Sequence, residues 1–249
     1  LSISQSGKSP DIVSAVDTAR KAGALTATIV NDISSPLAAT AEVLLAQHAG
    51  VEKCLAATKT VICTLTAIAR IAAAWTNEDS LKESLEELPR FLEEAVKIGL
   101  ESDENQLKGI TNAFILSRGL GLTTALETAL KFKETCGIHA EAFSAAEVRH
   151  GPREIVDQNY AVIAIALPGS GQEDVMAAAR ELKEQGARVL TIAPKSAGAD
   201  FPLPEGADPR LLPIVAIQTL YPWLARASKA LGRDPDHPRV LKSKIVETF

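Results

Sequence analysis

The sequence lacks the features that mark membrane proteins and general nucleic-acid-binding proteins. Aromatic residues make up 4% of its 249 residues, and acidic residues outnumber basic ones, for a formal net charge of -5. An acidic chain has no general attraction for nucleic acid, so any anionic ligand must be held by local donors. The most apolar stretch, residues 61–75, is broken by polar side chains and is shorter than the roughly 20 residues of a spanning helix. We therefore expect neither nucleic acid nor a membrane as a partner.

Cysteine is also scarce, and its spacing argues against two common structural roles. The three residues, Cys54, Cys63 and Cys136, are an odd number without metal-like spacing. This pattern fits neither a disulfide framework nor a zinc site, and it favours a reducing, cytoplasmic setting. The GxxxxGKS/T motif of the P-loop is absent too. Because the chain begins at Leu1 within an expected strand, we expect an upstream segment with a first strand and a further loop to be missing.

The sequence does have the alternation of strands and helices that is typical of an α/β fold. With 46% hydrophobic residues it can bury a substantial core. Its apolar periodicity predicts short strands between amphipathic helices, which indicates a parallel sheet with helices on both faces. In the first half we expect strands at 1–4, 25–30 and 42–45, helices at 11–22 and 52–75, a turn at 34–36, and one or two acidic helices at 80–101.

The second half repeats this plan. A shift of 163 residues brings similar residues into register, which favours an internal duplication; the matched pairs include Asp11 and Asp174, Gly23 and Gly186, and Thr28 and Thr191. A change of composition near residues 101–106 suggests two domains, 1–100 and 101–249. In the second we expect strands at 113–117, 161–167 and 188–193, helices from about residue 122 and at 173–185, a strand and a packing helix within 211–231, and then an ordered tail.

The loop at residues 4–9, between the first expected strand and helix, is rich in hydrogen-bond donors. Its donor side chains are Ser4, Gln5, Ser6 and Ser9. A loop that leaves the carboxyl end of a parallel strand and enters a helix directs backbone N–H groups and the positive helix end toward an anion. Gly7 lets the backbone approach closely, so phosphate suits this loop. The alternative is an ordinary helix cap, in which Ser9 and Pro10 simply start the helix.

The stretch 127–152 carries the densest group of ionisable residues. On a helix, Glu127, Lys131 and Glu134 fall on one face, opposite an apolar face. They form either a solvated ladder of ion pairs, each worth about a few tenths of a kcal/mol, or part of an acid–base site. The residues after them do not have the spacing of metal ligands, so we expect no metal. These residues are His139, Glu141 and His150.

Four segments together resemble the sugar isomerase (SIS) domain family over essentially the whole chain. The third is similar to the isomerase half of glucosamine-6-phosphate synthases, and the combination, without a glutaminase domain, looks most like SIS-type glucosamine-6-phosphate deaminases. The resemblance implies two flavodoxin-like SIS subdomains, each a parallel sheet with helices on both faces, in a homodimer with shared active sites. The four segments are ISQSGKSPD (3–11), AATKT (56–60), ALKFKETCGIHAEAFSAAEVRHGP (129–152) and DPDHPR (234–239).

The resemblance also implies roles for individual residues. Glu134 would move a proton between C2 and C1 of the sugar, with Lys131 beside it, and His150 would help to open the pyranose ring, reaching the neighbouring subunit's site. One carboxylate placed over both carbons suits the transfer, and ring opening needs an acid and a base of near-neutral pKa. The substrate-binding residues would be Ser4, Gln5, Ser6 and Ser9 for the phosphate and Leu55, through its backbone, for the sugar.

Two positions depart from the family pattern. Lys8 stands in the phosphate loop where relatives often have an acidic residue. In the synthases a lysine near the C-terminus takes part in catalysis, but counting from Pro238 places Ser243 at that position. Lys242 and Lys244, on either side of it, both remain candidates.

The function that these residues favour is deamination of glucosamine 6-phosphate to fructose 6-phosphate and ammonia, without a cofactor. An aldose–ketose isomerase, or an enzyme that cleaves another amino-sugar or fructosamine phosphate, would use the same loop and the same Glu134. An alternative of another class is a non-catalytic phosphosugar-binding regulator, which needs the loop but neither Glu134 nor His150. In each case the expected ligand is a phosphorylated sugar.

Overall fold

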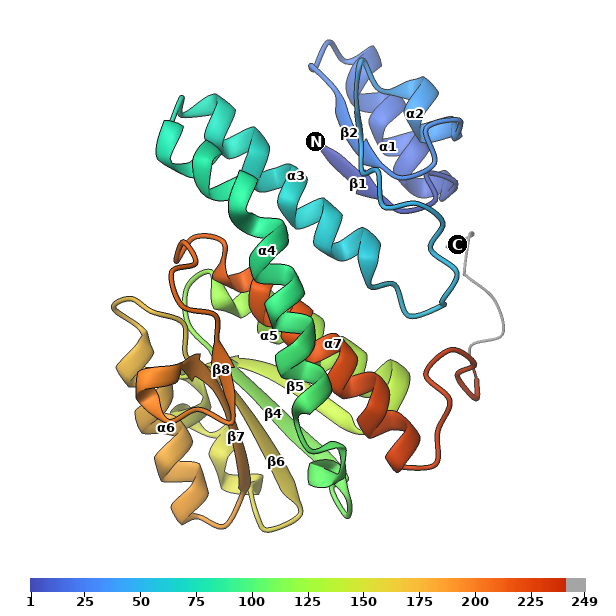
Figure 1. Cartoon of the computed structure of the whole chain (residues 1–249). Helices are drawn as coiled ribbons and strands as arrows, with labels where there is room; N and C mark the ends of the chain where they lie inside the picture. Colours follow the sequence, from blue (N-terminus) through green and yellow to red (C-terminus); the bar gives the residue numbers. More distant parts are fainter. Residues whose placement is uncertain (241–249) are drawn as a thin grey trace. The chain divides into compact units, whose positions relative to one another are not determined.

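The structure is a computed structural model that describes residues 1–240 (Figure 1). The chain forms two compact units, of which unit 1 contains residues 1–77 and unit 2 contains residues 78–238. The division expected at residues 101–106 therefore lies inside unit 2. The reason is the long acidic helix at 79–101, which packs along the last helix of unit 2. Among residues 1–240, no helix combines the length and apolar character that crossing a membrane requires.

Unit 1 contains a three-stranded parallel sheet whose strands alternate with helices. Its elements are β1 (Ser2–Ser4), α1 (Pro10–Lys21), β2 (Ala27–Val30), α2 (Pro36–Thr40), β3 (Val43–Ala46) and α3 (Lys59–Trp75). The strands pair in the order β1-β2-β3, with Ser4 opposite Val30 and Val30 opposite Ala46. Because all three strands are parallel, the loops after them meet at one edge of the sheet.

Unit 2 contains a five-stranded parallel sheet in the order β5-β4-β6-β7-β8. Its strands are β4 (Asn112–Ser117), β5 (His139–Ser144), β6 (Tyr160–Ile165), β7 (Arg188–Pro194) and β8 (Phe201–Leu203), and its α-helices are α4 (Asp79–Glu101), α5 (Gly121–Lys131), α6 (Gln172–Glu184) and α7 (Leu212–Ala230). A π-helical turn, η2 (Phe132–Cys136), follows α5, and short 3-10 helices lie at η1 (Glu104–Leu107), η3 (Glu147–His150), η4 (Pro152–Ile155) and η5 (Lys195–Ala197).

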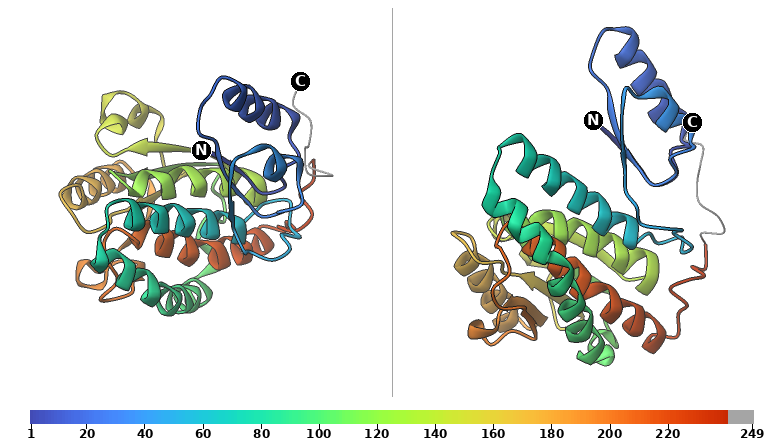
Figure 2. Two further views of the ribbon diagram at one scale, coloured as in Figure 1. Left: turned by 90° about the horizontal axis from the view of Figure 1, so that it is seen from above. Right: turned by 45° about the horizontal axis from the view of Figure 1, so that its top comes forward.

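Helices cover both faces of the sheet in unit 2. Figures 1 and 2 show α4, α5 and α7 on one face and α6 on the other. The helix α7 is the centre of its layer, since it packs against both α4 and α5. Helices α4 and α7 approach closely at Gly99, where an added Cβ would lie 2.2 Å from the main-chain oxygen of Thr219. This close packing fixes α7 beside α5, which carries the candidate site residues.

The core under α7 is built around one tryptophan. Trp223 is fully buried, and its ring meets that of Phe201 edge to face, with centroids 5.0 Å apart. Its indole N–H donates to the main-chain oxygen of Asp103 at 2.9 Å, so the polar atom of the ring is satisfied. Phe132, the first residue of η2, packs on the same ring. The π-helical turn is therefore anchored in the core of unit 2.

The structure confirms the expected alternation of strands and helices, and it corrects four details. The helix expected at 52–75 begins at Lys59, and the turn expected at 34–36 leads into the short helix α2. Strands β5 and β8 were not expected from the sequence. The segment 211–231 contains no strand: it forms the single helix α7, which continues through Pro222 because its apolar residues face inward along its whole length.

The order of the elements in the two units is in keeping with the expected internal duplication. Unit 1 runs β1-α1-β2-α2-β3-α3, and unit 2 ends with β6-α6-β7-η5-β8-α7. In each series the three strands are parallel and adjacent in sequence order. The loop at 4–9 thus occupies the same place after β1 as the loop at 166–171 occupies after β6.

Candidate functional site

The first part of the candidate site lies at the change from α-helix to π-helix after Lys131. A π-helical turn holds one extra residue and is found often at functional sites. Its polar groups have partners: the Thr135 hydroxyl donates to the main-chain oxygen of Lys131 at 2.8 Å, and the Ser228 hydroxyl of α7 donates to the main-chain oxygen of Thr135 at 2.8 Å. Gly137 ends the turn at a φ of 61°, which suits glycine.

This turn brings Lys131 and Glu134 into contact. The Lys131 Nζ lies 2.5 Å from Glu134 Oε2 and 3.4 Å from Glu127 Oε1. The Tyr221 hydroxyl of α7 donates to the same Glu127 oxygen at 2.8 Å. One ammonium therefore lies between two carboxylates, and a phenol from another helix fixes one of them.

The cluster is largely removed from solvent. The side chains of Lys131, Glu127 and Glu134 are 4%, 13% and 21% exposed. Burial raises the pKa of Glu127, while the Lys131 ammonium and the Tyr221 hydroxyl oppose that rise. The first alternative drawn from the sequence, a solvated ladder, is therefore wrong, because this face of α5 turns toward α7. Leu126, expected on the packed face, is 59% exposed.

His150 lies away from this cluster. Glu134 belongs to the turn just before β5, whereas His150 ends the 3-10 helix η3 that follows β5. A strand of this length spans about 20 Å, so the two residues lie near opposite ends of β5. His150 is exposed, as is His139 at the start of the same strand. In the described part of the chain, no three histidine, cysteine or carboxylate side chains gather as metal ligands.

The second part of the candidate site is the loop at 4–9 of unit 1. The Ser4 hydroxyl accepts a hydrogen bond from the backbone N–H of Gly7 at 3.0 Å, which closes the loop into a tight turn. The backbone N–H of Asp32 donates to the Gln5 main-chain oxygen at 3.4 Å. Gly7 has a φ of 64°, and an added Cβ would lie 2.1 Å from the Ser35 hydroxyl oxygen. Only glycine fits this position without movement of Ser35.

The start of α1 distinguishes a helix cap from a ligand-binding loop. Ser9 is the N-cap residue, yet its side chain makes no capping hydrogen bond. Pro10 begins the helix and needs no partner for its nitrogen. By contrast, Ser35 caps α2 by accepting from the Ala38 N–H at 3.3 Å. The α1 turn thus leaves the Ser9 hydroxyl out of the cap. Lys8 extends to Asp32, with Nζ and Oδ2 3.4 Å apart.

Leu55 lies in the segment that precedes α3, and a buried carboxylate organises this segment. The Glu52 carboxylate accepts from the backbone N–H groups of Thr58 and Thr60 at 3.1 and 3.0 Å and from the Thr60 hydroxyl. It satisfies N–H groups at the start of α3 that would otherwise lack partners. From the sequence, Glu52 was expected inside the helix, so this role was missed. The threonines of the AATKT segment could have indicated a helix start there.

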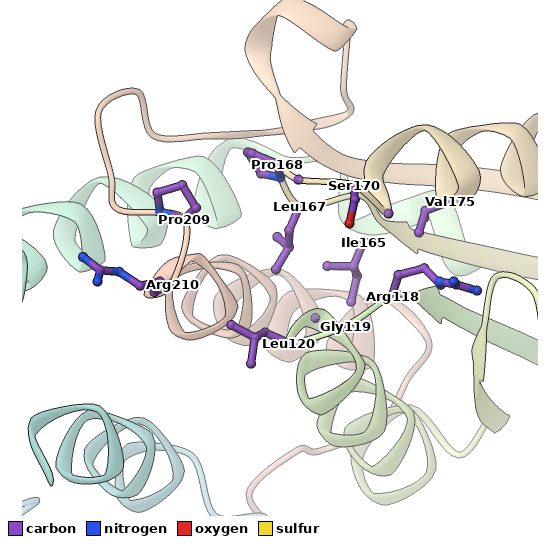
Figure 3. Close-up of a pocket in the computed structure, with 13 residues that line it drawn as sticks. Arg118, Gly119, Leu120, Ile165, Leu167, Pro168, Ser170, Val175, Pro209 and Arg210 are labelled. Atoms are coloured by element: carbon purple, nitrogen blue, oxygen red, sulfur yellow. The ribbon is translucent and has the colours of Figure 1, made fainter. Parts of the chain in front are cut away.

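A pocket of about 390 Å³ opens beyond the carboxyl ends of β4 and β6 in unit 2. The chain continues from β4 to β5 on one side and from β6 to β7 on the other. Ligands often bind in such folds where neighbouring strands connect in opposite directions. Figure 3 shows Arg118 and Arg210 on opposite sides of the pocket. Arg118 pairs with Asp174 at 3.4 Å, and Arg210 pairs with Asp208 at 2.5 Å. Both guanidinium groups thus have a carboxylate partner, although Asp174 also pairs with Arg149 at 2.5 Å.

Within residues 1–240, none of the site residues expected from the sequence lines this pocket. It lies at the first residues of α5, whereas Lys131 is the last residue of that helix, about 15 Å away along the axis. The candidate lysines Lys242 and Lys244 lie outside the described residues. The structure therefore brings together Lys131 and Glu134 in unit 2, and Ser4, Gln5, Ser6 and Ser9 in unit 1.

Comparison with known proteins identifies the family. The SIS domain model matches residues 106–207. The chain is 34% identical over 265 residues to a glutamine–fructose-6-phosphate aminotransferase (isomerizing) from Thermococcus kodakarensis, covering 99% of this chain and 44% of the relative. A relative of the same name from Methanothermobacter thermautotrophicus is also 34% identical, with 98% of this chain and 42% of the relative covered. The chain thus spans less than half the length of these relatives.

Solved structures agree with this assignment. A candidate phosphosugar isomerase from Silicibacter pomeroyi is 34% identical with a TM-score of 0.84, covering 94% of this chain and 72% of that chain. A glucosamine-6-phosphate deaminase from Thermotoga maritima is 23% identical with a TM-score of 0.81, covering 99% and 74%, and shares the fold. From these similarities and from its parallel α/β architecture, the chain belongs to the sugar isomerase (SIS) domain family.

Proposed function

We propose that the protein converts glucosamine 6-phosphate and water into fructose 6-phosphate and ammonia. The observation that carries the proposal is the 2.5 Å contact between Lys131 Nζ and Glu134 Oε2 in a largely buried setting. Burying an ion pair seldom adds stability, since desolvation offsets much of the attraction. A carboxylate beside an ammonium is, however, what a proton transfer next to a carbonyl group needs. The relatives named for fructose 6-phosphate support a phosphosugar substrate.

Glu134 is the proposed base. In the open-chain sugar it takes the proton from C2, and the electron pair moves into a C1–C2 double bond while negative charge collects on the C1 oxygen. The Lys131 ammonium offsets this charge. Glu134 then returns the proton to C1. A proton also passes from the C2 amino group to the C1 oxygen, which leaves a hydroxyl at C1 and an imine at C2. Water adds to the imine, and loss of ammonia gives the ketone of fructose 6-phosphate.

The loop at 4–9 is the proposed phosphate site. Its hydroxyl donors are Ser4, Ser6 and Ser9, with Gln5 beside them, and the Ser9 hydroxyl is not used to cap α1. The positive end of α1 favours an anion at this position. Leu55 is proposed to line the sugar through its backbone. No cofactor or metal is required for this path.

His150 is proposed to open the pyranose ring in the active site of a second copy of the chain. Its exposure on η3, beyond the carboxyl end of β5, supports a role outside its own Lys131–Glu134 cluster. The proposal therefore includes a homodimer with shared active sites. It also keeps Lys242 and Lys244 as candidate catalytic lysines. None of the three cysteines forms a disulfide, in keeping with a proposed cytoplasmic location.

The direct test is an assay of the full-length protein with glucosamine 6-phosphate. We expect ammonia and fructose 6-phosphate to form in equal amounts. Fructose 6-phosphate formed from glucose 6-phosphate, with no ammonia from the amino sugar, would contradict the deaminase proposal and favour an aldose–ketose isomerase. Tight phosphosugar binding without any turnover would instead indicate a regulator.

A further inference from the structure

The ion pair proposed for catalysis leaves one neighbour unexplained. Glu127 is as close to Lys131 as an ion pair requires, with 3.4 Å between Glu127 Oε1 and Lys131 Nζ, and its side chain is 13% exposed. A second buried carboxylate is unfavourable unless it has a task or strong partners. Its partners are Lys131 and the Tyr221 hydroxyl, which donates to Oε1 at 2.8 Å.

The need for Glu127 follows from the charge changes of the proposed reaction. While Glu134 is ionised, it holds the Lys131 ammonium at 2.5 Å. Once Glu134 has taken the proton from the sugar, it is neutral and attracts that ammonium much less. Without Glu127, a lysine that is 4% exposed would then have only the charge on the sugar oxygen to hold it. No protein carboxylate would fix its position at the moment when the intermediate needs its charge.

We infer that Glu127, fixed by Tyr221, is a positioning residue that holds the Lys131 ammonium in place while Glu134 carries the substrate proton. This inference rests on the proposed function and extends it to two residues outside the reacting pair. Glu127 faces Lys131 from one turn earlier in α5, so the ammonium keeps one ionised partner throughout the cycle. Tyr221 comes from α7, so the packing of that helix on α5 sets where Glu127 points.

The structure also gives the order in which the residues depend on one another. Tyr221 acts on the cluster through its hydrogen bond to Glu127, and Glu127 acts on Lys131. Loss of the Tyr221 hydroxyl should therefore lower kcat less in a variant that already lacks the Glu127 carboxylate. The titratable groups that act on Glu127 are Lys131, Glu134 and Tyr221. Burial already favours the neutral form of Glu127, so removing the hydroxyl should make Glu127 take up a proton at higher pH.

The test uses Glu127→Gln, Tyr221→Phe and the double variant of the full-length protein, with glucosamine 6-phosphate as substrate. We expect Glu127→Gln to lower kcat at least about tenfold, in line with loss of one charged hydrogen-bond partner, and to change KM less than about twofold. At high pH, Tyr221→Phe should lower kcat less than Glu127→Gln does. As the pH falls, the kcat of Tyr221→Phe should approach that of Glu127→Gln. The double variant should lower kcat by less than the product of the two single effects.

Matched controls separate positioning from general damage. Glu94→Gln changes an exposed glutamate of α4, and Tyr160→Phe changes the other tyrosine of the chain; both should keep kcat near wild type. Circular dichroism and thermal melting check that each variant folds. Effects of Glu127→Gln and Tyr221→Phe that simply multiply in the double variant, or that appear in KM alone, would overturn the inference.

A second measurement keeps the inference testable if the proposed function fails. In ¹⁵N-lysine-labelled protein, the Lys131 ammonium should give a slowly exchanging signal, assigned by its loss in Lys131→Arg. Glu127→Gln should speed this exchange several-fold, and Tyr221→Phe should speed it less. An unchanged signal would refute the positioning role whether or not the wild type deaminates glucosamine 6-phosphate. Absent turnover with a changed signal would refute the proposed function alone.

Discussion

The Thr135 hydroxyl donates a hydrogen bond to the main-chain oxygen of Lys131, with 2.8 Å between the two oxygens. The bond crosses the point where α5 becomes the π-helical turn η2, and Thr135 is 9% exposed. It therefore links the backbone of the proposed ammonium donor to the turn that carries Glu134. Thr135 is the residue directly after Glu134, so this short bond couples the positions of both members of the ion pair.

We predict that Thr135→Val destabilises the protein by about 1–2 kcal/mol, because valine keeps the shape but loses a buried hydrogen bond. It should also lower kcat, since the backbone that positions Lys131 and Glu134 becomes less constrained. Urea denaturation and steady-state kinetics measure the two effects. Thr76→Val is the matched control, because its hydroxyl makes the same type of bond, to the Ala72 oxygen at 2.9 Å, in an exposed position. Equal losses in both variants would contradict the prediction.

A second prediction concerns Gly7. Alanine there would place its Cβ 2.1 Å from the Ser35 hydroxyl oxygen and 2.9 Å from a Val30 methyl carbon, at a φ of 64°. The loop must move to relieve these contacts, so Gly7→Ala should weaken phosphosugar binding at least about tenfold, a free-energy change of about 1.4 kcal/mol. Isothermal titration with glucosamine 6-phosphate measures the affinity.

The control for Gly7 is Gly23, which also has a positive φ, 86°, but no atom within 4 Å of an added Cβ. Gly23→Ala carries the backbone strain of about 1–2 kcal/mol without the clash. It should lower stability and leave the affinity of the folded protein unchanged. If Gly23→Ala weakened phosphosugar binding as much as Gly7→Ala, strain alone would account for the loss.

A third prediction tests the division of labour between Glu134 and His150. Glu134→Gln should lower kcat about 10²–10⁴-fold, the usual contribution of a general acid or base, while phosphosugar binding is retained. If His150 acts in the neighbouring subunit's site, mixing Glu134→Gln with His150→Ala should restore part of the activity, because mixed dimers contain one site with both residues intact. A mixture no more active than its components would argue against a shared site.

The elements that the sequence predicted well are those set by local patterns. The periodicity of residues 10–21 and 172–184, and the apolar runs of β2, β4, β6 and β7, depend on near neighbours in the chain. The loop at 4–9 was identified for the same reason, since its hydroxyl residues lie within six positions of the sequence. The two units have an equivalent order of elements, and the duplication suggested by the 163-residue shift stays a prediction.

The parts that could not be predicted depend on contacts between distant residues. Glu127, one partner of Lys131, accepts a hydrogen bond from Tyr221 of α7, which is 94 residues away in the sequence. The π-helical turn is supported by the Ser228 hydroxyl, 93 residues away from Thr135. Helical spacing alone made Glu127, Lys131 and Glu134 look like a solvated face. No pattern of period 3.6 indicates which helix will lie against that face.

The last prediction concerns Asp208, which holds the start of α7 and so indirectly the cluster at Tyr221. Its carboxylate accepts from the Ser84 hydroxyl at 2.8 Å and pairs with Arg210, with 2.5 Å between Arg210 Nη2 and Asp208 Oδ2. The Arg210 guanidinium holds the pKa of Asp208 well below its usual range. A carboxyl group with a lowered pKa in the folded state stabilises the protein above its unfolded-state pKa, about 3.9. This stability is lost as the pH falls through that value toward the folded-state pKa.

Asp208→Asn should therefore cost about 1 kcal/mol at pH 7, after allowance for the solvent that reaches Arg210. The difference in stability from wild type should shrink as the pH falls below about 4, because the ionised wild-type carboxylate then stabilises the folded state less. Urea denaturation at pH 7 and at pH 3 measures both values. Asp17→Asn, which breaks an exposed pair with Lys21, should change stability by less than about 0.5 kcal/mol. A difference between wild type and Asp208→Asn that stayed constant with pH would show that Asp208 contributes through shape or neutral hydrogen bonds and not through its charge.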